Sequence, residues 1–93
     1  MARVGTGTIG TGTGEGFDVV LTAGTPHRVY VHPDDPTVDF DLFVYDEHGN
    51  LVDQDVNTSA DAYCVITPRW TGPFNLVVTS ARGASSYQIL VED

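Results

Sequence analysis

The sequence predicts an all-β fold, an antiparallel, jelly-roll-like β-sandwich of about eight strands in a single domain. Strand-like runs of about five to eight residues recur at regular spacing, and turns rich in Gly, Pro, Asn and Asp separate them. No run has the periodicity of an amphipathic helix. The 93 residues are enough for one modest hydrophobic core and too few for a second fold.

The first part of the chain contains three expected strands. Residues 6–14 alternate threonine and glycine, with one interruption at Ile9. The segment GFDVVLTAG follows, and its Phe17, Val19 and Leu21 would share one apolar face. The strand HRVYVH comes next and ends at HPDDP, because proline cannot continue a strand interior.

The central segment VDFDLFVYDEHGNLVDQDV predicts a β-hairpin, since apolar and polar residues alternate on both sides of DEHGN. Asp46 stands at the first turn position and Gly49 at the fourth. We therefore expect a three-residue loop in which Gly49 adopts a left-handed backbone. This loop fixes which residues face each other across the hairpin: Asp46 and Asn50, Val44 and Val52, Asp41 and Asp55, Asp39 and Asn57.

Three further strands, AYCVIT, FNLVVTS and SYQILVE, complete the sandwich, with PRWTGP and ARGAS as the turns between them. The first contains Cys64, which is the only cysteine and so excludes an intramolecular disulfide. Because Cys64 alternates with Tyr63 and Val65, we expect it to be a buried small apolar side chain. A free thiol or an intermolecular bridge is the alternative.

The hairpin register predicts a crowding of negative charge. Directly facing side chains in a sheet have Cβ atoms roughly 5 Å apart, so the facing Asp41 and Asp55 would repel each other. The chain has no lysine, and its four arginines lie outside the hairpin. A divalent cation would relieve the repulsion, and calcium tolerates irregular cages of oxygen ligands. The alternative is an acidic face that water solvates and salt screens.

The candidate calcium ligands fall into three groups, and none has the spacing of an EF-hand loop. The facing pairs supply the first group, a neighbour on the same side supplies the second, and nearby loops supply the third. In that order the residues are Asp39, Asp41, Asp55 and Asn57; Asp53; and Asp34, Asp35 and Asp61.

Charge and motif content exclude several classes of function. A net charge of -9 argues against binding nucleic acid or anionic lipid, which requires basic patches. No segment is apolar enough to predict membrane insertion, and the N-terminal residues contain no signal-peptide apolar region. The chain contains no nucleophile-elbow, zinc-protease or phosphate-loop motif, so we expect no enzymatic activity. A paired-carboxylate glycosidase built on Asp41 and Asp55 is disfavoured by the lack of a large cleft.

The segments LTAGT, VYV, DFDLFVYDEHGNLVDQD, TGPFNLVVTS and SYQILV occur in an order that resembles the bacterial pre-peptidase C-terminal (PPC) domain, a relative of collagenase collagen-binding domains. The similarity covers roughly Glu15 to Val91. The residues that match its central motif are Asp39, Asp41, Leu42, Tyr45, Asp46, Gly49 and Asn50, and those that match its Gly-x-Tyr-x-Leu-x-Val pattern are Gly72, Phe74, Leu76 and Val78, with Phe in place of Tyr. The resemblance implies a jelly-roll sandwich, calcium binding, an extracellular (secreted or cell-surface) setting and no catalysis.

The chain divides into a Gly/Thr-rich N-terminal strand or arm, residues 1–14, and a PPC-like sandwich, residues 15–93. Glycine weakens an isolated strand, so the arm would be ordered only against a neighbour. That neighbour is either the arm's own domain or the exposed sheet edge of another copy, as in donor-strand exchange. Exchange that does not close on itself makes filaments or tubes. A flexible leader is the alternative.

The sequence therefore favours an extracellular, calcium-binding sandwich that self-assembles into a structural homopolymer, a filament or tube. The second hypothesis is an accessory module that binds a glycan or a matrix protein for a secreted enzyme system. Aromatic residues could form its binding platform: Tyr30, Phe43, Tyr45, Tyr63, Trp70 and Phe74.

Overall fold

A computed structural model describes the backbone of residues 2–92 and the side chains of residues 4–92. Every regular element in this part of the chain is a β-strand, which confirms the all-β prediction. Within it there is no helix long and apolar enough to cross a membrane. The eight strands are β1 (Ala2–Ile9), β2 (Gly14–Leu21), β3 (His27–Pro33), β4 (Asp39–Tyr45), β5 (Leu51–Asp55), β6 (Ala62–Ile66), β7 (Gly72–Arg82) and β8 (Ser85–Glu92).

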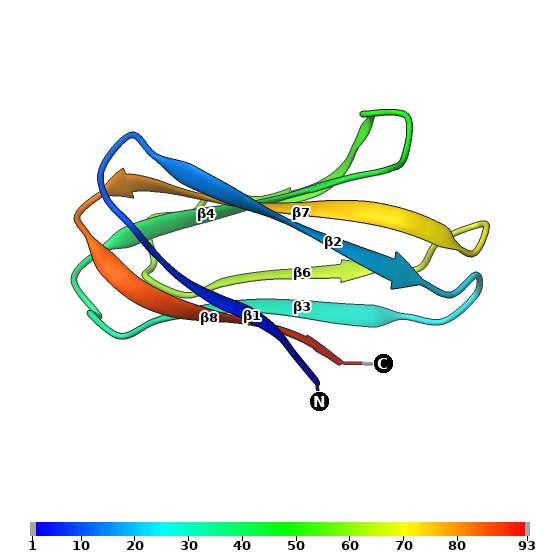
Figure 1. The fold of residues 1–93 in the computed structure, drawn as a ribbon, viewed down its shortest axis with the longest axis horizontal. Coiled ribbons are helices and arrows are strands. Elements are labelled where there is room, and N and C mark those ends of the chain that lie inside the picture. Colours follow the sequence, from blue (N-terminus) through cyan, green and yellow to red (C-terminus); the bar gives the residue numbers. More distant parts are fainter. Residues whose placement is uncertain (1, 93) are drawn as a thin grey trace.

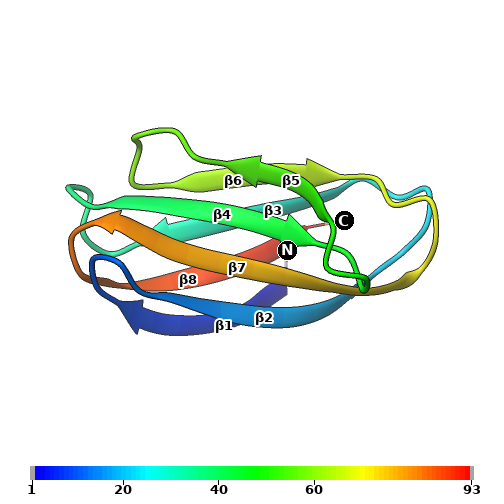
Figure 2. The same ribbon diagram turned by 90° about the horizontal axis from the view of Figure 1, so that it is seen from above.

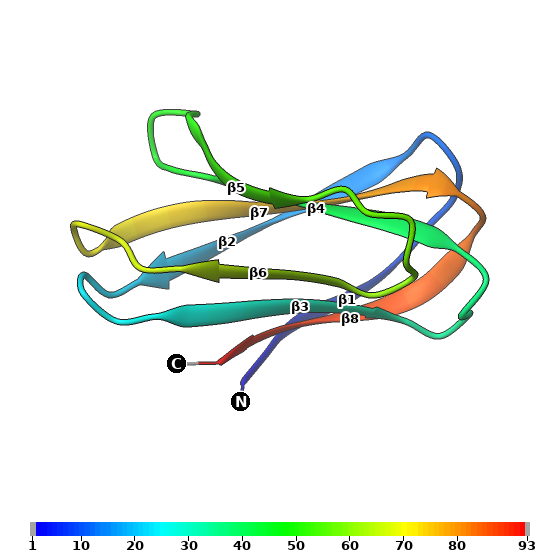
Figure 3. The same cartoon turned by 180° about the vertical axis from the view of Figure 1, so that it is seen from behind.

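The strands form two antiparallel sheets of four strands each, which pack face to face as a sandwich (Figure 1). One sheet has the strand order β1-β8-β3-β6 and the other has the order β2-β7-β4-β5. The edge strands β1 and β2 therefore lie along one side of the sandwich, and β5 and β6 lie along the opposite side (Figure 2). Seen from behind, β5 and β6 run one above the other in different sheets (Figure 3).

The hydrophobic core fills the space between the sheets and follows the predicted alternation along each strand. On β4, Leu42 and Val44 are fully buried, while Phe43 and Tyr45 lie on the outer face of the sheet and are half-buried. The Cys64 side chain is buried in the same core, as predicted. Alternation of this kind gives each sheet one apolar face, and burial of these two faces stabilises the sandwich.

The N-terminal strand β1 lies in the same sandwich as the strands that follow it. It pairs antiparallel with β8, from Ala2 opposite Val91 to Ile9 opposite Ser85. The glycine face of β1 turns inward, where a Cβ atom on Gly7 would clash with a Glu15 carboxylate oxygen and lie 2.7 Å from the Tyr87 hydroxyl oxygen that donates to it. The bare face therefore makes room for an aromatic side chain of the core.

The hairpin turn is as predicted, but the register of its strands is not. Gly49 has a φ of 82°, and its amide donates to the carbonyl oxygen of Asp46 at 3.1 Å. Tyr45 pairs with Leu51, whereas Val44 pairs with Asp53, so a β-bulge at Val52 separates the two pairs.

The bulge shifts every later pair by one residue, and this overturns three predicted pairs. Val44 faces Asp53, so its predicted opposition to Val52 is wrong. Asp55 faces Leu42, so the predicted opposition of Asp41 and Asp55 is wrong. The strand β5 ends at Asp55, so the expected pair of Asp39 and Asn57 does not form either. Because side chains alternate between faces, a slip of one residue moves Asp53 and Asp55 to the inner side of their sheet.

Candidate metal site

The Asp55 carboxylate of β5 covers an amide on the free edge of β6. One oxygen of Asp55, Oδ2, accepts a hydrogen bond from the Tyr63 amide at 2.9 Å, and the other accepts one from the Asn57 amide at 3.1 Å. Charged side chains that point inward are one means by which sheet proteins block edge-to-edge pairing. Both oxygens of Asp55 thus accept hydrogen bonds from backbone amides, and one of these bonds caps the edge of β6.

Asp53 lies on the same inner side, beside the Cys64 thiol. Burial, the negative charges of Asp53 and Asp55, and a hydrogen bond with Asp53 together raise the pKa of the Cys64 thiol to about 12. The thiolate is the reactive form of cysteine, so this thiol is held in its unreactive state at neutral pH. The predicted ligands on β5 are therefore engaged in structural contacts and do not face Asp39 and Asp41.

The predicted ligands on β4 have a different environment. Asp39 and Asp41 lie two residues apart on the outer face of their sheet, where β7 places Arg82 and Thr79 opposite them. The Oδ1 atom of each carboxylate is buried and has no hydrogen-bond partner among the described residues. Arg82 does not relieve this deficit, because its guanidinium donates to the Thr37 carbonyl oxygen at 3.2 Å.

The electrostatics agree with that geometry. Burial raises the pKa of the Asp41 carboxyl above its usual value, and the negative charges of Asp39 and Asp55 raise it further. A buried acceptor without a donor costs free energy, and two such acceptors of like charge cost more. The pair Asp39 and Asp41 is therefore the part of the predicted site in which carboxylate oxygens still lack a counter-charge.

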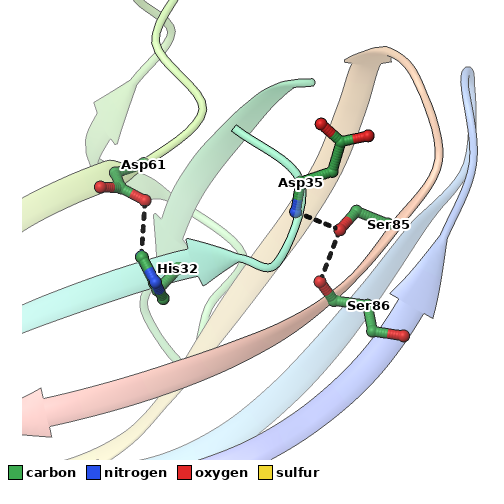
Figure 4. Close-up of polar contacts among 5 residues, drawn as sticks. All are labelled: His32, Asp35, Asp61, Ser85 and Ser86. Carbon is green, nitrogen blue, oxygen red and sulfur yellow. Dashed lines mark hydrogen bonds and ion pairs between the residues drawn. The ribbon is translucent and has the colours of Figure 1, made fainter. Parts of the chain in front are cut away.

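The remaining predicted ligands lie elsewhere. Asp61 lies directly before β6, and its Oδ1 is 2.8 Å from Nδ1 of the exposed His32 on β3 (Figure 4). Asp35 anchors the turn before β4, since its Oδ1 accepts bonds from the amide and the hydroxyl of Thr37. Asp34 is exposed in the same turn, and its amide donates to the Ser86 carbonyl oxygen at 2.9 Å.

A single site built from all eight predicted ligands is therefore not present. No three His, Cys, Asp or Glu side chains within the described part of the chain are grouped closely enough to hold a metal ion. The two β4 carboxylates fit a hard divalent cation chemically, since their unpaired oxygens are the ligands that calcium prefers. Further oxygens, from water or another molecule, would have to complete its coordination.

Asp46 is a buried carboxylate, although the sequence predicted it only as a turn residue. Its Oδ1 accepts bonds from the amides of His48 and Asn50 at 2.8 and 2.9 Å, and its Oδ2 accepts one from the Asn50 side chain at 3.1 Å. The bonds from Asn50 and His48 lower the pKa of this carboxyl. Aspartate at the first turn position is the sequence signal for such a bonded turn.

The exposed apolar side chains are concentrated on the edge strands and the loops beside them. Six of the seven large ones lie on the β5/β6 side or in the loop after β6, and the seventh, Val20, is on β2. The six are Leu51, Val52, Val56, Tyr63, Val65 and Trp70. A groove of about 260 Å³ opens among them, and Val52, Val65, Pro68, Arg69, Trp70 and Phe74 contribute to its lining.

Comparison with models of known protein families finds no match for this chain. Comparison with curated protein sequences likewise finds no similar protein. The resemblance to the PPC domain therefore rests on the residues quoted above, and the function must be argued from the site itself.

Proposed function

We propose that this chain is a non-catalytic, extracellular β-sandwich that binds calcium at Asp39 and Asp41 and associates with copies of itself into a structural homopolymer. The observation that supports calcium is the pair of buried, unpartnered Oδ1 atoms on neighbouring outer-face positions of β4. A cation between them would offset both the missing hydrogen bonds and the mutual repulsion. The extracellular setting rests on the resemblance to the PPC domain alone.

Self-association is supported by the charge balance and by the exposed edges. A chain of net charge -9 repels its own copies over a Debye length of roughly 8 Å at physiological salt, and bound calcium would lower that charge. Each sheet ends in two edge strands, and of these β6 has one amide, that of Tyr63, covered by Asp55. Exchange of β1 between copies is one route, because its pairing with β8 could equally form between two chains.

A calorimetric titration with calcium tests the metal proposal directly. We expect saturable binding to the wild-type chain and its loss in the double variant Asp39→Asn with Asp41→Asn, which keeps the side-chain volumes. The control is Asp61→Asn, directly before β6, which should bind as the wild type does. Binding that survives the double substitution would place any calcium elsewhere and refute this site.

Sedimentation velocity with calcium and with a chelator tests the association proposal. We expect larger assemblies with calcium and smaller species without it, since removal of the cation restores the repulsion. A chain that stays monomeric at all concentrations in both conditions would refute self-association.

The second candidate function is a glycan- or matrix-binding module, and one observation favours it. Tyr30 and Tyr63 lie side by side on the outer face of the sheet that contains β3 and β6, with ring centroids 4.7 Å apart and ring planes tilted by 41°. Exposed aromatic rings of this kind can support a sugar ring or a peptide. Retention of the monomer on an immobilised polysaccharide or collagen, and its loss in Tyr63→Ala, would favour this function over assembly.

A further inference from the structure

The groove at the end of the β5/β6 side is lined by apolar and aromatic side chains. Its rim includes Trp70, which is 39% exposed and whose ring stacks on Phe74 at a centroid separation of 6.0 Å. Val52 and Val65 face it from two different sheets. An apolar groove with an aromatic wall is suited to receive a small apolar side chain.

A single positive charge adjoins this groove. Arg69 is exposed and forms no hydrogen bond or ion pair with any residue that the structure describes, whereas Arg28 pairs with Glu92 and Arg82 bonds to Thr37. In a chain with 13 acidic and 4 basic side chains, an arginine without a carboxylate partner is an unusual feature. The groove therefore combines an apolar surface with a guanidinium group that has no counter-ion.

A matching feature lies on the edge strand of the opposite side. Val20 on β2 is 70% exposed, the largest exposure among the large apolar side chains of the described region. Asp18 lies two residues before it, so both side chains project from the same face of the strand roughly 7 Å apart. One edge of the molecule thus presents an apolar side chain beside a carboxylate, and another presents an apolar groove beside a guanidinium.

We propose that a second copy of this chain occupies the groove, with its Val20 inserted between Val52 and Trp70 and its Asp18 paired with Arg69. This contact names the surfaces for the self-association proposed above and rests on that proposal. It is heterologous, because the two surfaces differ and lie on different strands of each copy. An exposed apolar side chain that fits a pocket elsewhere on the same molecule leads to open, extended assemblies unless the rotation closes a ring.

Two variants that each destroy one surface give the decisive test. Val20→Glu removes the inserted side chain, and Val52→Glu places a charge in the groove; both positions are exposed, so we expect both proteins to fold, as thermal unfolding will confirm. Each should weaken association by about tenfold or more, as expected for the loss of a buried valine contact. Ala84→Glu, in the exposed turn between β7 and β8, is the charge-matched control and should associate as the wild type does.

Mixing the two variants distinguishes this contact from others. Val20→Glu keeps an intact groove and Val52→Glu keeps an intact Val20, so an equimolar mixture should form a heterodimer at concentrations at which neither variant associates alone. Emission from Trp70, the only tryptophan, should shift to shorter wavelength in the mixture as the groove becomes covered. A charge exchange adds a second test: Asp18→Arg and Arg69→Asp should each weaken association, and the two changes together in one chain should restore it.

The possible failures are separable. If the wild type associates and both glutamate variants associate equally well, the surfaces are wrong while self-association stands, and exchange of β1 becomes the route to test. If the mixture of the two variants stays monomeric while each variant alone is also monomeric, this contact is refuted. If the wild type itself never associates, both the contact and the proposed function fail.

Discussion

Replacing Asp41 by asparagine should change the stability of the protein in opposite directions with and without calcium. In a chelator, the substitution removes a negative charge that neighbours Asp39 on the same strand and has one buried, unpartnered oxygen, so the melting temperature should rise above that of the wild type. With calcium, the wild type should gain stability that the variant cannot gain. A reversal in the order of the two melting temperatures is the signature of a cation at this carboxylate.

The size of the calcium effect follows from mass action. Extracellular calcium modules have dissociation constants of about 10⁻⁴ to 10⁻³ M, so about 10 mM calcium corresponds to roughly 10 to 100 times the dissociation constant. Binding to the folded state alone then adds about 1.4 to 2.7 kcal/mol to the free energy of unfolding. For a domain of this size the expected rise in the wild-type melting temperature is roughly 6 to 20 °C.

Differential scanning calorimetry in chelator and in calcium measures the order of the two melting temperatures and the rise that calcium causes in each. Asp61→Asn is the control, because it removes an exposed carboxylate that pairs with His32 and should leave the calcium gain intact. If Asp41→Asn keeps the full calcium gain, or if the chelator-treated variant is less stable than the wild type, the assignment of unpaired charge to Asp41 is wrong.

The pH dependence of stability independently checks whether the charge on Asp41 destabilises the folded protein when calcium is absent. Because burial and neighbouring charge raise the pKa of Asp41 in the folded protein, the folded state holds its proton more tightly than the unfolded chain does. The associated stability is fully present below the usual aspartate value of 3.8 and is lost as the pH rises through the raised pKa. In a chelator, the advantage of Asp41→Asn should therefore be largest at neutral pH and vanish in acid.

Three further predictions concern the sandwich itself. Leu76→Ala empties a fully buried core position and should cost about 2 to 5 kcal/mol in denaturant unfolding, whereas Val77→Ala on the outer face should cost far less; equal costs would contradict the assignment of faces. Gly7→Val should lower the melting temperature, because its Cβ would lie 2.7 Å from the Tyr87 hydroxyl oxygen; an unchanged value would mean that β1 does not pack there. Cys64 should react with a thiol reagent only after unfolding, because its pKa is raised to about 12 and it is buried; rapid labelling of the native protein would refute its position.

Much of the fold could be predicted because local patterns and global structure agree. The alternation in DFDLFVY sets the faces of β4, and the structure buries Leu42 and Val44 as that pattern requires. The turn was predictable from Asp46 and Gly49 alone, because few residues adopt a left-handed backbone at low cost. Such signals are local, so they can be interpreted without knowledge of the rest of the chain.

The register beyond the turn could not be predicted in the same way. In β5 the apolar residues Leu51 and Val52 are adjacent and the other three residues are polar, so the sequence does not show which of the two is the bulge residue. What favours the bulge is tertiary: it turns Asp55 toward the Tyr63 amide on the edge of the other sheet. A contact between strands of different sheets cannot be predicted from the sequence of either strand alone. For this reason only Asp39 and Asp41 remain from the predicted set of metal ligands.

The pairing of β1 with β8 also determines how the protein would respond to mechanical load. Ala2 lies opposite Val91, so the two strands nearest the chain ends are antiparallel neighbours and leave the sandwich at the same end (Figure 1). Tension between these ends would act along the hydrogen bonds that join the strands and break them one after another. Pulled in this geometry, the molecule would unzip at low force, whereas tension applied through opposite ends of its strands would load many bonds at once.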